Sequence, residues 1–234
     1  MSALLESPVV WVTVTFATFL IGKHLYSRLR FPLFHPVLVG ILGVIALLVT
    51  LDVDYDTYSR GGDIISFFLG PSVVALGLPL HERFQQMKAQ TPALLLSVTA
   101  GSLVGLVTAL LPVILMSAPD LIVMSMAPKS ITTPIAISVA EQLNGDGSLA
   151  ASFVVMCGIL GGVIGPAILK LVGVRDPVAF GYALGAASHG VGTARALESG
   201  RTEGAAGSLA ICLNGIATSI LAPAVVSAVM GLSG

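Results

Sequence analysis

The chain has 234 residues, of which 55% are hydrophobic and only 10% are charged, whereas about a quarter of the residues in a soluble globular domain are charged. Eleven basic and twelve acidic side chains are too few to cover a water-soluble protein of this size, but a protein dissolved in lipid needs few of them. The net charge is −1 and no long basic run occurs, which excludes the electrostatic footprint of a nucleic-acid-binding protein. Composition therefore predicts the lipid bilayer as solvent and no nucleic-acid partner.

Charged residues separate seven uncharged windows, each about long enough to cross hydrocarbon as a helix. An eighth apolar stretch, residues 121–140, is interrupted only by Lys129. The windows are apolar on all sides rather than alternating with a period of two, so we predict helices and no strands. The expected fold is an all-α integral membrane protein with seven to eight transmembrane segments in one domain, 1–234, with its scaffold near 1–60 and its core near 61–234. The windows are residues 7–22, 31–51, 64–80, 89–119, 147–169, 177–194 and 204–234.

The charges between the windows predict an orientation. The positive-inside rule places the basic residues 23–30 in the cytoplasm, the acidic residues 52–63 outside and residues 81–90 inside again. Beyond residue 120 the rule stops helping, because full crossings would put Lys170 and Arg175 outside. Either this asymmetry is too small to matter, or one later segment dips into the membrane and returns.

The first anomaly is the run Met126–Pro134 in the middle of an apolar segment. Pro128 and Pro134 lack an N–H and clash with the preceding turn, so we expect two half-helices joined by unwound backbone. Lys129 would lie near mid-bilayer, where a charge costs roughly 2.5 to 3.5 kcal/mol, and should therefore face a partner or an anion.

Hydroxyl groups accompany this lysine. Ser130, Thr132 and Thr133 follow Lys129 directly, and a half-helix that starts near Pro134 directs free N–H groups to the same place. The pattern predicts a cradle for a small anion. The alternative is that Lys129 reaches the interface from a helix end and that the hydroxyls only satisfy the backbone around a proline kink.

The second anomaly is the run Gly185–Arg195, followed by Glu198. We expect Gly190 and Gly192 to loosen or break a helix here and to let the backbone approach a ligand. His189 is the only histidine inside an expected span, and a histidine can take a proton near neutral pH, which suits coupling to a proton gradient.

Several residues near this run remain open to two interpretations. His189 is either a proton carrier or a histidine that is hydrogen-bonded between helices, and Arg195 either adds a second positive charge or pairs with Glu198 one turn later. Ser188 and Thr193 are further polar candidates of the same segment. Asn214, alone in the last apolar window, either supports the site or bonds to a neighbouring helix.

Two interrupted segments in one chain are typical of secondary transporters, in which broken helices meet near the membrane midplane. An enzyme is less favoured: Ser130 and Ser188 each neighbour a possible base, but adjacent helical residues point about 100° apart. No GxSxG, HExxH or CxxC motif is present, and Cys157 and Cys212 lie in apolar stretches, so we expect neither a metal nor a cofactor. A pore remains the stronger competitor.

Pairs of glycines at a spacing of four predict close helix packing within or between subunits. They occur among Gly158, Gly161, Gly162 and Gly165, in Gly101 with Gly105, and in Gly181 with Gly185.

The two interrupted segments resemble signatures of the LrgB family, also called CidB/LrgB or YohK-type membrane proteins. Residues 128–136, PKSITTPIA, are similar to the PKSVTTPIA signature, and residues 187–195, ASHGVGTAR, are similar to ASHAxGTAR. Gly190 replaces the commoner Ala. Because the resemblance also takes in residues 31–33, 55–58 and 73–80, it covers nearly the full length.

The resemblance implies two functions. One is an antiholin-like role, in which the protein modulates murein hydrolase activity and cell lysis with a smaller LrgA- or CidA-type partner. The other is transport, since plant relatives resemble a fusion of both partners and act as the plastidal glycolate/glycerate translocator, and bacterial relatives are linked to pyruvate movement. The implied fold is similar to cation/proton antiporters and bile-acid symporters, with two crossed, unwound helices and Lys129 at the crossing.

We therefore expect a multi-pass inner-membrane transporter of small 2-hydroxy or 2-oxo monocarboxylates, with lysis modulation as the alternative. Lys129 would pair with the carboxylate, and a homodimer through a face rich in small residues is expected, with an LrgA-like partner as a further expectation. The other expected substrate-binding residues are Ser130, Thr132, Thr133, Ser188, His189, Thr193 and Arg195, with Glu198 and Asn214 in support.

Overall fold

The computed structural model describes residues 5–29, 31, 34–75, 81 and 91–231, and within them every regular element is a helix. Residues 1–72 form one compact unit and residues 73–234 a second. Because residues 82–90 are outside the described part, so is most of the basic loop that we expect inside the cell.

The first unit is built on close contacts between three helices. α2 (Pro8–Leu29) packs against α3 (Pro36–Thr50) and α4 (Tyr55–Ser66), and α5 (Leu69–Ala75) follows. Gly61 of α4 lies so near to α2 that a Cβ there would be 2.8 Å from Trp11 Cβ, and the rings of Trp11 and Tyr58 meet edge to face with centroids 5.9 Å apart. Small residues thus allow the backbones to approach where lipid supplies no hydrophobic drive.

Three long helices form the frame of the second unit: α7 (Thr91–Leu115), α10 (Gly147–Leu171) and α12 (Arg201–Gly231). They expose large apolar side chains, such as Leu96 (74%) and Ile220 (71%), which would be a liability in water but suit a lipid-facing surface. Within the described residues, α2, α7 from Pro92, α10 and α12 are long and apolar enough to cross a membrane, and α3 is shorter. This supports a multi-pass membrane protein, but the predicted count of seven to eight crossings is not confirmed.

Residues 120–142 form a helical hairpin, which we call hairpin 1. α8 (Asp120–Met126) and α9 (Thr133–Gln142) are separate helices, as the prolines predict. The chain after α9 returns to α8, because the Asp146 amide donates a hydrogen bond to Ser125 Oγ at 2.8 Å, and a Cβ on Gly145 would lie 2.8 Å from the Ser125 amide nitrogen. Residues 126–144 therefore start and finish at the same place and do not cross to the other side.

Residues 177–199 form a second hairpin, hairpin 2. α11 (Pro177–Ser199) is non-helical at Ser188 (φ −135°, ψ 20°) and His189 (φ 42°, ψ −129°). Gly207 of α12 lies against both halves of α11, since a Cβ on Gly207 would be 3.2 Å from the Gly181 carbonyl oxygen and 3.0 Å from Thr193 Oγ1. Residues 177–187 and 190–199 therefore lie side by side along α12 after the chain reverses.

Two predictions about these segments are corrected. The break in α11 lies at Ser188 and His189, whereas we expected it at Gly190 and Gly192; the positive φ of 42° at the break is adopted by the histidine. Gly192 is needed for another reason: a Cβ there would overlap the Leu184 carbonyl oxygen of the opposite half. The two interrupted segments also turn back on themselves, whereas the resemblance implied two crossed, unwound helices.

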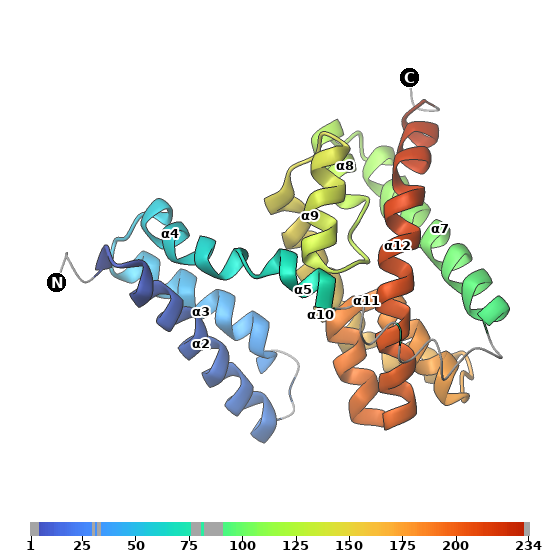
Figure 1. Ribbon diagram of the computed structural model, residues 1–234, viewed down its shortest axis with the longest axis horizontal. Coiled ribbons are helices and arrows are strands. Elements are labelled where there is room, and N and C mark those ends of the chain that lie inside the picture. Colours follow the sequence, from blue (N-terminus) through green and yellow to red (C-terminus); the bar gives the residue numbers. More distant parts are fainter. Residues whose placement is uncertain (1–4, 30, 32–33, 76–80, 82–90, 232–234) are drawn as a thin grey trace. The chain divides into compact units, whose positions relative to one another are not determined.

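The two hairpins enter the second unit from opposite ends. α7 and α12 run parallel, since Leu94 packs with Leu209 near their starts and Leu106 packs with Ala222 further along. In Figure 1 α8 and α9 lie toward the C-terminal end of α12, and α11 lies toward its N-terminal end. A long helix followed by a hairpin thus occurs twice in the second unit, as α7 with hairpin 1 and as α10 with hairpin 2. The two copies run in opposite directions.

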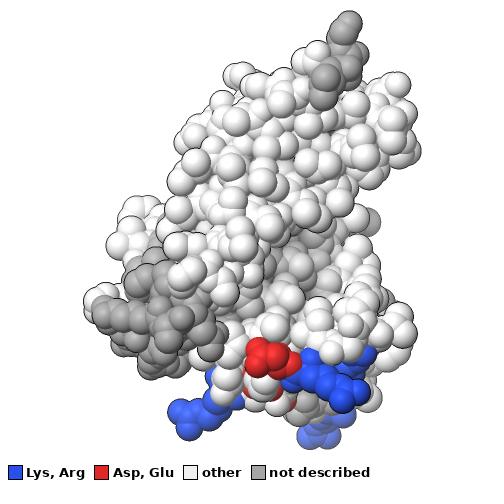
Figure 2. All heavy atoms as spheres, turned by 90° about the vertical axis from the view of Figure 1, so that its right-hand side faces the viewer, with Lys and Arg blue, Asp and Glu red and all other residues white. Residues whose placement is uncertain are grey.

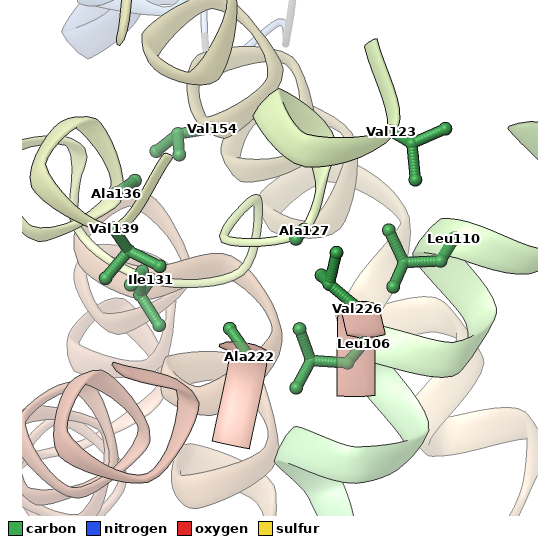
Figure 3. Packing of buried hydrophobic residues seen from close by; sticks show 10 residues of the cluster. All are labelled: Leu106, Leu110, Val123, Ala127, Ile131, Ala136, Val139, Val154, Ala222 and Val226. Carbon is green, nitrogen blue, oxygen red and sulfur yellow. The ribbon is translucent and has the colours of Figure 1, made fainter. Parts of the chain in front are cut away.

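A buried apolar cluster holds hairpin 1 between α7, α10 and α12. In Figure 3, Leu106 of α7 and Val226 of α12 point toward each other, with Ala127 of hairpin 1 beside them. Side chains of both hairpin 1 helices and its turn thus take part in the core of the second unit. The buried members are Leu106, Leu110, Val123, Ala127, Ile131, Ala136, Val139, Val154, Ala222 and Val226.

Charged side chains mark the two ends of the second unit. Among the described residues on the face shown in Figure 2 they gather at one end. Of the side chains that the structure describes, four basic and three acidic ones lie at the end where hairpin 2 enters, whereas Asp120, Glu141 and Asp146 lie where hairpin 1 enters. The positive-inside rule therefore places the hairpin 2 end in the cytoplasm, and Lys170 and Arg175 with it. The seven residues at that end are Lys170, Arg175, Asp176, Arg195, Glu198, Arg201 and Glu203.

This topology predicts that Met116, after α7, and Gln142, at the end of α9, lie on the same side of the membrane. Single cysteines at these positions, with Cys157 and Cys212 changed to Ala, should both react with an impermeant maleimide added to intact cells. Arg175→Cys should react only after the membrane is opened. If Met116→Cys and Gln142→Cys were labelled from opposite sides, residues 120–142 would cross the bilayer and hairpin 1 would be wrong.

Candidate functional site

Several buried polar groups of the second unit lie at one depth. α7, α10, α11 and α12 have their midpoints at residues 103, 159, 188 and 216, from the bounds of each helix. Ser102, Ser188 and Asn214 are within two residues of these midpoints and are 3%, 1% and 3% exposed. Because α7, α10 and α12 are long enough to span the hydrocarbon, this layer lies near the middle of the bilayer.

Asn214 joins the turns of the two hairpins. Its Nδ2 donates to the carbonyl oxygen of Ser130 at 3.1 Å and to that of Ala186 at 2.9 Å. Its Oδ1 accepts a hydrogen bond from Ser102 Oγ at 2.7 Å. One side chain of α12 therefore ties hairpin 1, hairpin 2 and α7 together, which confirms that the two interrupted segments meet.

The turn of hairpin 1 is compact. The Lys129 amide donates to Met126 O at 3.1 Å and the Ile131 amide to Pro128 O at 3.2 Å, so the unwound stretch consists of short turns before the extended Thr132. In a continuous helix the carbonyl of Ser130 would face residue 134, but Pro134 has no N–H to offer. Pro134 thus leaves the Ser130 carbonyl without its usual helical donor, and Asn214 donates to it instead.

Lys129 lies in this turn as a half-buried cation. Its Nζ donates to Ser130 Oγ at 3.1 Å, and among the described side chains no carboxylate lies within 4.0 Å of it. α9 begins beside it at Thr133, and the N–H groups of Thr133 and Ile135 precede the first intrahelical bond, from Ala136 to Thr132. A charge and the positive end of a helix therefore meet near mid-depth, where an anion would be stabilised.

The turn of hairpin 2 is held by His189. Its Nε2 lies 2.9 Å from the Val154 carbonyl oxygen of α10, and because a carbonyl only accepts, Nε2 carries the proton. A φ of 42° is strained for a residue with a side chain, by about 1 to 3 kcal/mol, and such strain persists where surrounding contacts fix it. Gly158 and Gly161 of α10 provide the space for His189 and Ser188.

Three hydroxyl groups that the sequence singles out are buried without a hydrogen-bond partner: Thr132 Oγ1, Ser188 Oγ and Thr193 Oγ1. They do not all converge. Ser188 faces α10 at Gly161, and Thr193 faces α12 at Gly207, whereas Thr132 precedes α9 without capping it. The structure therefore brings Lys129, Ser130, Thr132 and Thr133 into one turn, and places Ser188 and His189 in the turn opposite.

Arg195 lies apart from these turns. It forms an ion pair with Glu198 near the end of α11, where the two side chains are 44% and 32% exposed. This is the second of the two interpretations that the sequence allows, and it leaves Arg195 remote from Lys129 in depth. A separate groove of about 260 Å³ lies between α7 and α12. Apolar side chains such as Leu95, Ile216 and Ile220 line it and no charged group does, so it does not suit an anion.

Sequence reasoning missed two participants. Ser102 orients Asn214, and the backbone carbonyl of Val154 binds His189. Ser102 lies between Gly101 and Gly105, which marked α7 as a packing helix, but no local pattern connects it with Asn214, 112 residues away. Two of the glycine groups behave as predicted, because Gly161 and Gly165 pack on α11 and Gly181 and Gly185 pack on α12, whereas a Cβ on Gly101 would meet nothing within 4 Å.

Comparison with known proteins finds relatives over nearly the whole chain. The profile of the LrgB-like family matches residues 15–228. Antiholin-like protein LrgB of Bacillus subtilis is 30% identical over 226 residues, 96% of this chain and 98% of the relative. Holin-like protein CidB of Staphylococcus epidermidis is 27% identical, and protein YxaC of Bacillus subtilis 34% identical, each over 93% of this chain and 95% of the relative. No solved structure matches.

The close approach of α10 and hairpin 2 predicts the effect of a methyl group. Gly161→Ala places a Cβ on Ser188 Oγ and should lower the free energy of unfolding by about 1 to 3 kcal/mol. Gly101→Ala is the matched control, because a Cβ there meets nothing within 4 Å and should leave stability unchanged or raise it by up to about 1 kcal/mol. Thermal unfolding in detergent measures both, and equal midpoints would refute the packing.

Proposed function

The chain belongs to the LrgB-like family, and we propose that it is a secondary carrier of small 2-hydroxy or 2-oxo monocarboxylates, of the glycolate, glycerate or pyruvate type, in the cell's inner membrane. The observation that carries this proposal is the meeting of two opposed hairpin turns at mid-depth, next to a lysine that pairs with no carboxylate in the described part of the chain. Broken helices that meet at the midplane between inverted repeats are the common site of secondary carriers.

Lys129 gives the proposed site its charge selectivity. A monocarboxylate carries one negative charge, which one lysine neutralises, so the pair can be buried where either ion alone is costly. The free N–H groups at the start of α9 and the unpartnered hydroxyl of Thr132 add donors for a carboxylate or for the adjacent 2-hydroxy or 2-oxo oxygen. Ser130 and Thr133 orient the substrate from the same turn.

Hairpin 2 would close the site from the cytoplasmic side. Ser188 has a buried hydroxyl without a partner, and a small rotation of the turn would direct it toward the substrate. Thr193 has the same property one turn further on. His189 offers its second ring nitrogen to a proton while Nε2 stays bound to α10, which would couple substrate movement to protons.

A second candidate function is modulation of cell lysis, and the names of the relatives favour it. A holin-like and an antiholin-like protein align with 93% and 96% of this chain. In this proposal the protein acts with an LrgA- or CidA-type partner, and a homodimer is its basic unit. The two functions differ in what passes the membrane: a carrier exchanges one class of solute and saturates, whereas a lesion passes any solute below a limiting size.

Counterflow in liposomes tests the carrier. The purified protein should exchange labelled glycolate, glycerate or pyruvate with saturation. Lys129→Ala should reduce the rate at least tenfold, because the substrate's charge would lose its counter-ion. Lys170→Ala is the matched control: it removes the same charge at the exposed end of α10 and should leave exchange intact. Equal exchange by both variants would exclude Lys129 from the site.

The same liposomes distinguish the second function. Release of unrelated dyes, graded by their size and independent of carboxylate, would favour a lysis-related pore and would count against the carrier. If the protein forms a lysis-related pore, addition of an LrgA-type partner should change dye release. If it is a carrier, the partner should leave saturable exchange unchanged.

Proton coupling has a separate prediction. His189→Gln keeps a donor for the Val154 carbonyl but cannot titrate, so exchange should continue while its dependence on pH between about 5 and 8 is lost. Rates across that range measure this, with His24→Gln, at the exposed end of α2, as the control. An unchanged pH profile in His189→Gln would leave this histidine with a packing role.

A further inference from the structure

We infer that Asn214 couples the two hairpins, so that one hairpin turn can be released only while the other stays bound. This inference rests on the proposed carrier function and adds a positioning residue to it. It starts from the four hydrogen bonds of one buried amide, each of which reaches a different group.

The hydrogen-bonding capacity of Asn214 is fully used. The two protons of Nδ2 go to two carbonyls, one in each hairpin, and Oδ1 accepts from Ser102 Oγ at 2.7 Å and Thr218 Oγ1 at 3.4 Å. The two carbonyls fix which end of the amide is nitrogen, because a carbonyl oxygen only accepts and an amide turned by 180° would set its own oxygen against both of them. The hydroxyls of Ser102 and Thr218 then donate to Oδ1. The protons therefore stay directed one at each hairpin turn.

Both carbonyls lie at an interruption of a helix. Ser130 O would face the N–H of residue 134, which is Pro134 and has none. Ala186 O lies two residues before the non-helical Ser188. In lipid such groups must find a donor inside the protein.

Movement of either hairpin must break one of these bonds. If hairpin 1 moves outward, water from the outside can bind the released carbonyl and amide proton, while Ala186 remains bound and hairpin 2 closed. If hairpin 2 moves toward the cytoplasm, the reverse holds. Release of both turns together would break both hydrogen bonds of the Nδ2 group, whereas either single opening keeps one of them, so simultaneous opening is the most costly arrangement.

Labelling of cysteines in the turns tests this coupling without substrate. In a background with Cys157 and Cys212 changed to Ala, Ser130→Cys reports opening of hairpin 1 to the outside, and Ala187→Cys reports opening of hairpin 2 to the cytoplasm. Intact cells and inside-out vesicles expose one side each to an impermeant maleimide. Asn214→Asp keeps the acceptor and loses both donors, so both labelling rates should rise at least fivefold.

Asn144→Asp is the matched control, because this substitution makes the same chemical change at a residue that lies exposed in the loop after α9. Ser102→Ala is the second variant: it keeps both donors but loses one hydroxyl that orients them, so labelling should rise in the same direction by less. Elution as a single species and an unfolding midpoint close to that of the parent establish that each variant is folded.

A chain carrying both cysteines tests exclusion directly. A bulky maleimide at Ala187→Cys holds hairpin 2 open and should slow outside labelling of Ser130→Cys at least threefold in the Asn214 chain, and not in Asn214→Asp. Unchanged labelling in folded Asn214→Asp, or independent labelling of the two turns in the Asn214 chain, would overturn the coupling. Loss of counterflow alone would overturn the carrier and not this inference, because labelling requires no transported solute.

Discussion

The second unit depends on one constraint: every backbone carbonyl at mid-bilayer depth must have a donor from within the protein. A chain that reverses direction inside the membrane violates this constraint at each reversal. Here the two reversals lie at the same depth, and one amide, that of Asn214, binds the carbonyls of Ser130 and Ala186 together. A residue of α12 thus provides hydrogen-bond donors for carbonyl groups of two other segments. These bonds hold together the turns of hairpins that enter from opposite ends.

Small residues and prolines make these reversals sterically possible. Pro128 and Pro134 end α8 and fix the start of α9, and Gly192 lets the two halves of hairpin 2 touch. The costly element is the left-handed backbone at His189, which its hydrogen bond to Val154 and the space at Gly158 hold in place. A strained turn fixed by contacts from a neighbouring helix is a turn that can rearrange when those contacts change.

The sequence predicted the breaks but not the direction of the chain beyond them. Pro128 and Pro134 act on their own turns of helix, so the interruption near Lys129 follows from local stereochemistry. Whether a half-helix continues or returns depends on contacts such as Ser125 with Asp146, and these contacts are tertiary. Lys170 and Arg175 carried the only hint, because their charges conflict with a full crossing of residues 121–140. The partners of Asn214 lie 84 and 28 residues away, beyond any periodic pattern.

The hairpin arrangement also bears on the choice between carrier and lesion. A lesion needs a continuous polar path, whereas here Ser102, Ser188 and Asn214 lie in one thin buried layer in which Asn214 binds both hairpin turns. Above and below that layer, α7 packs on α12 through apolar side chains such as Leu94 and Leu110. A lone lysine with free helix N–H groups beside it fits the capture of one anion at a time. For a protein of this structure, a role in lysis would arise through a partner or through the solute that is transported, and the second unit itself would not form the pore.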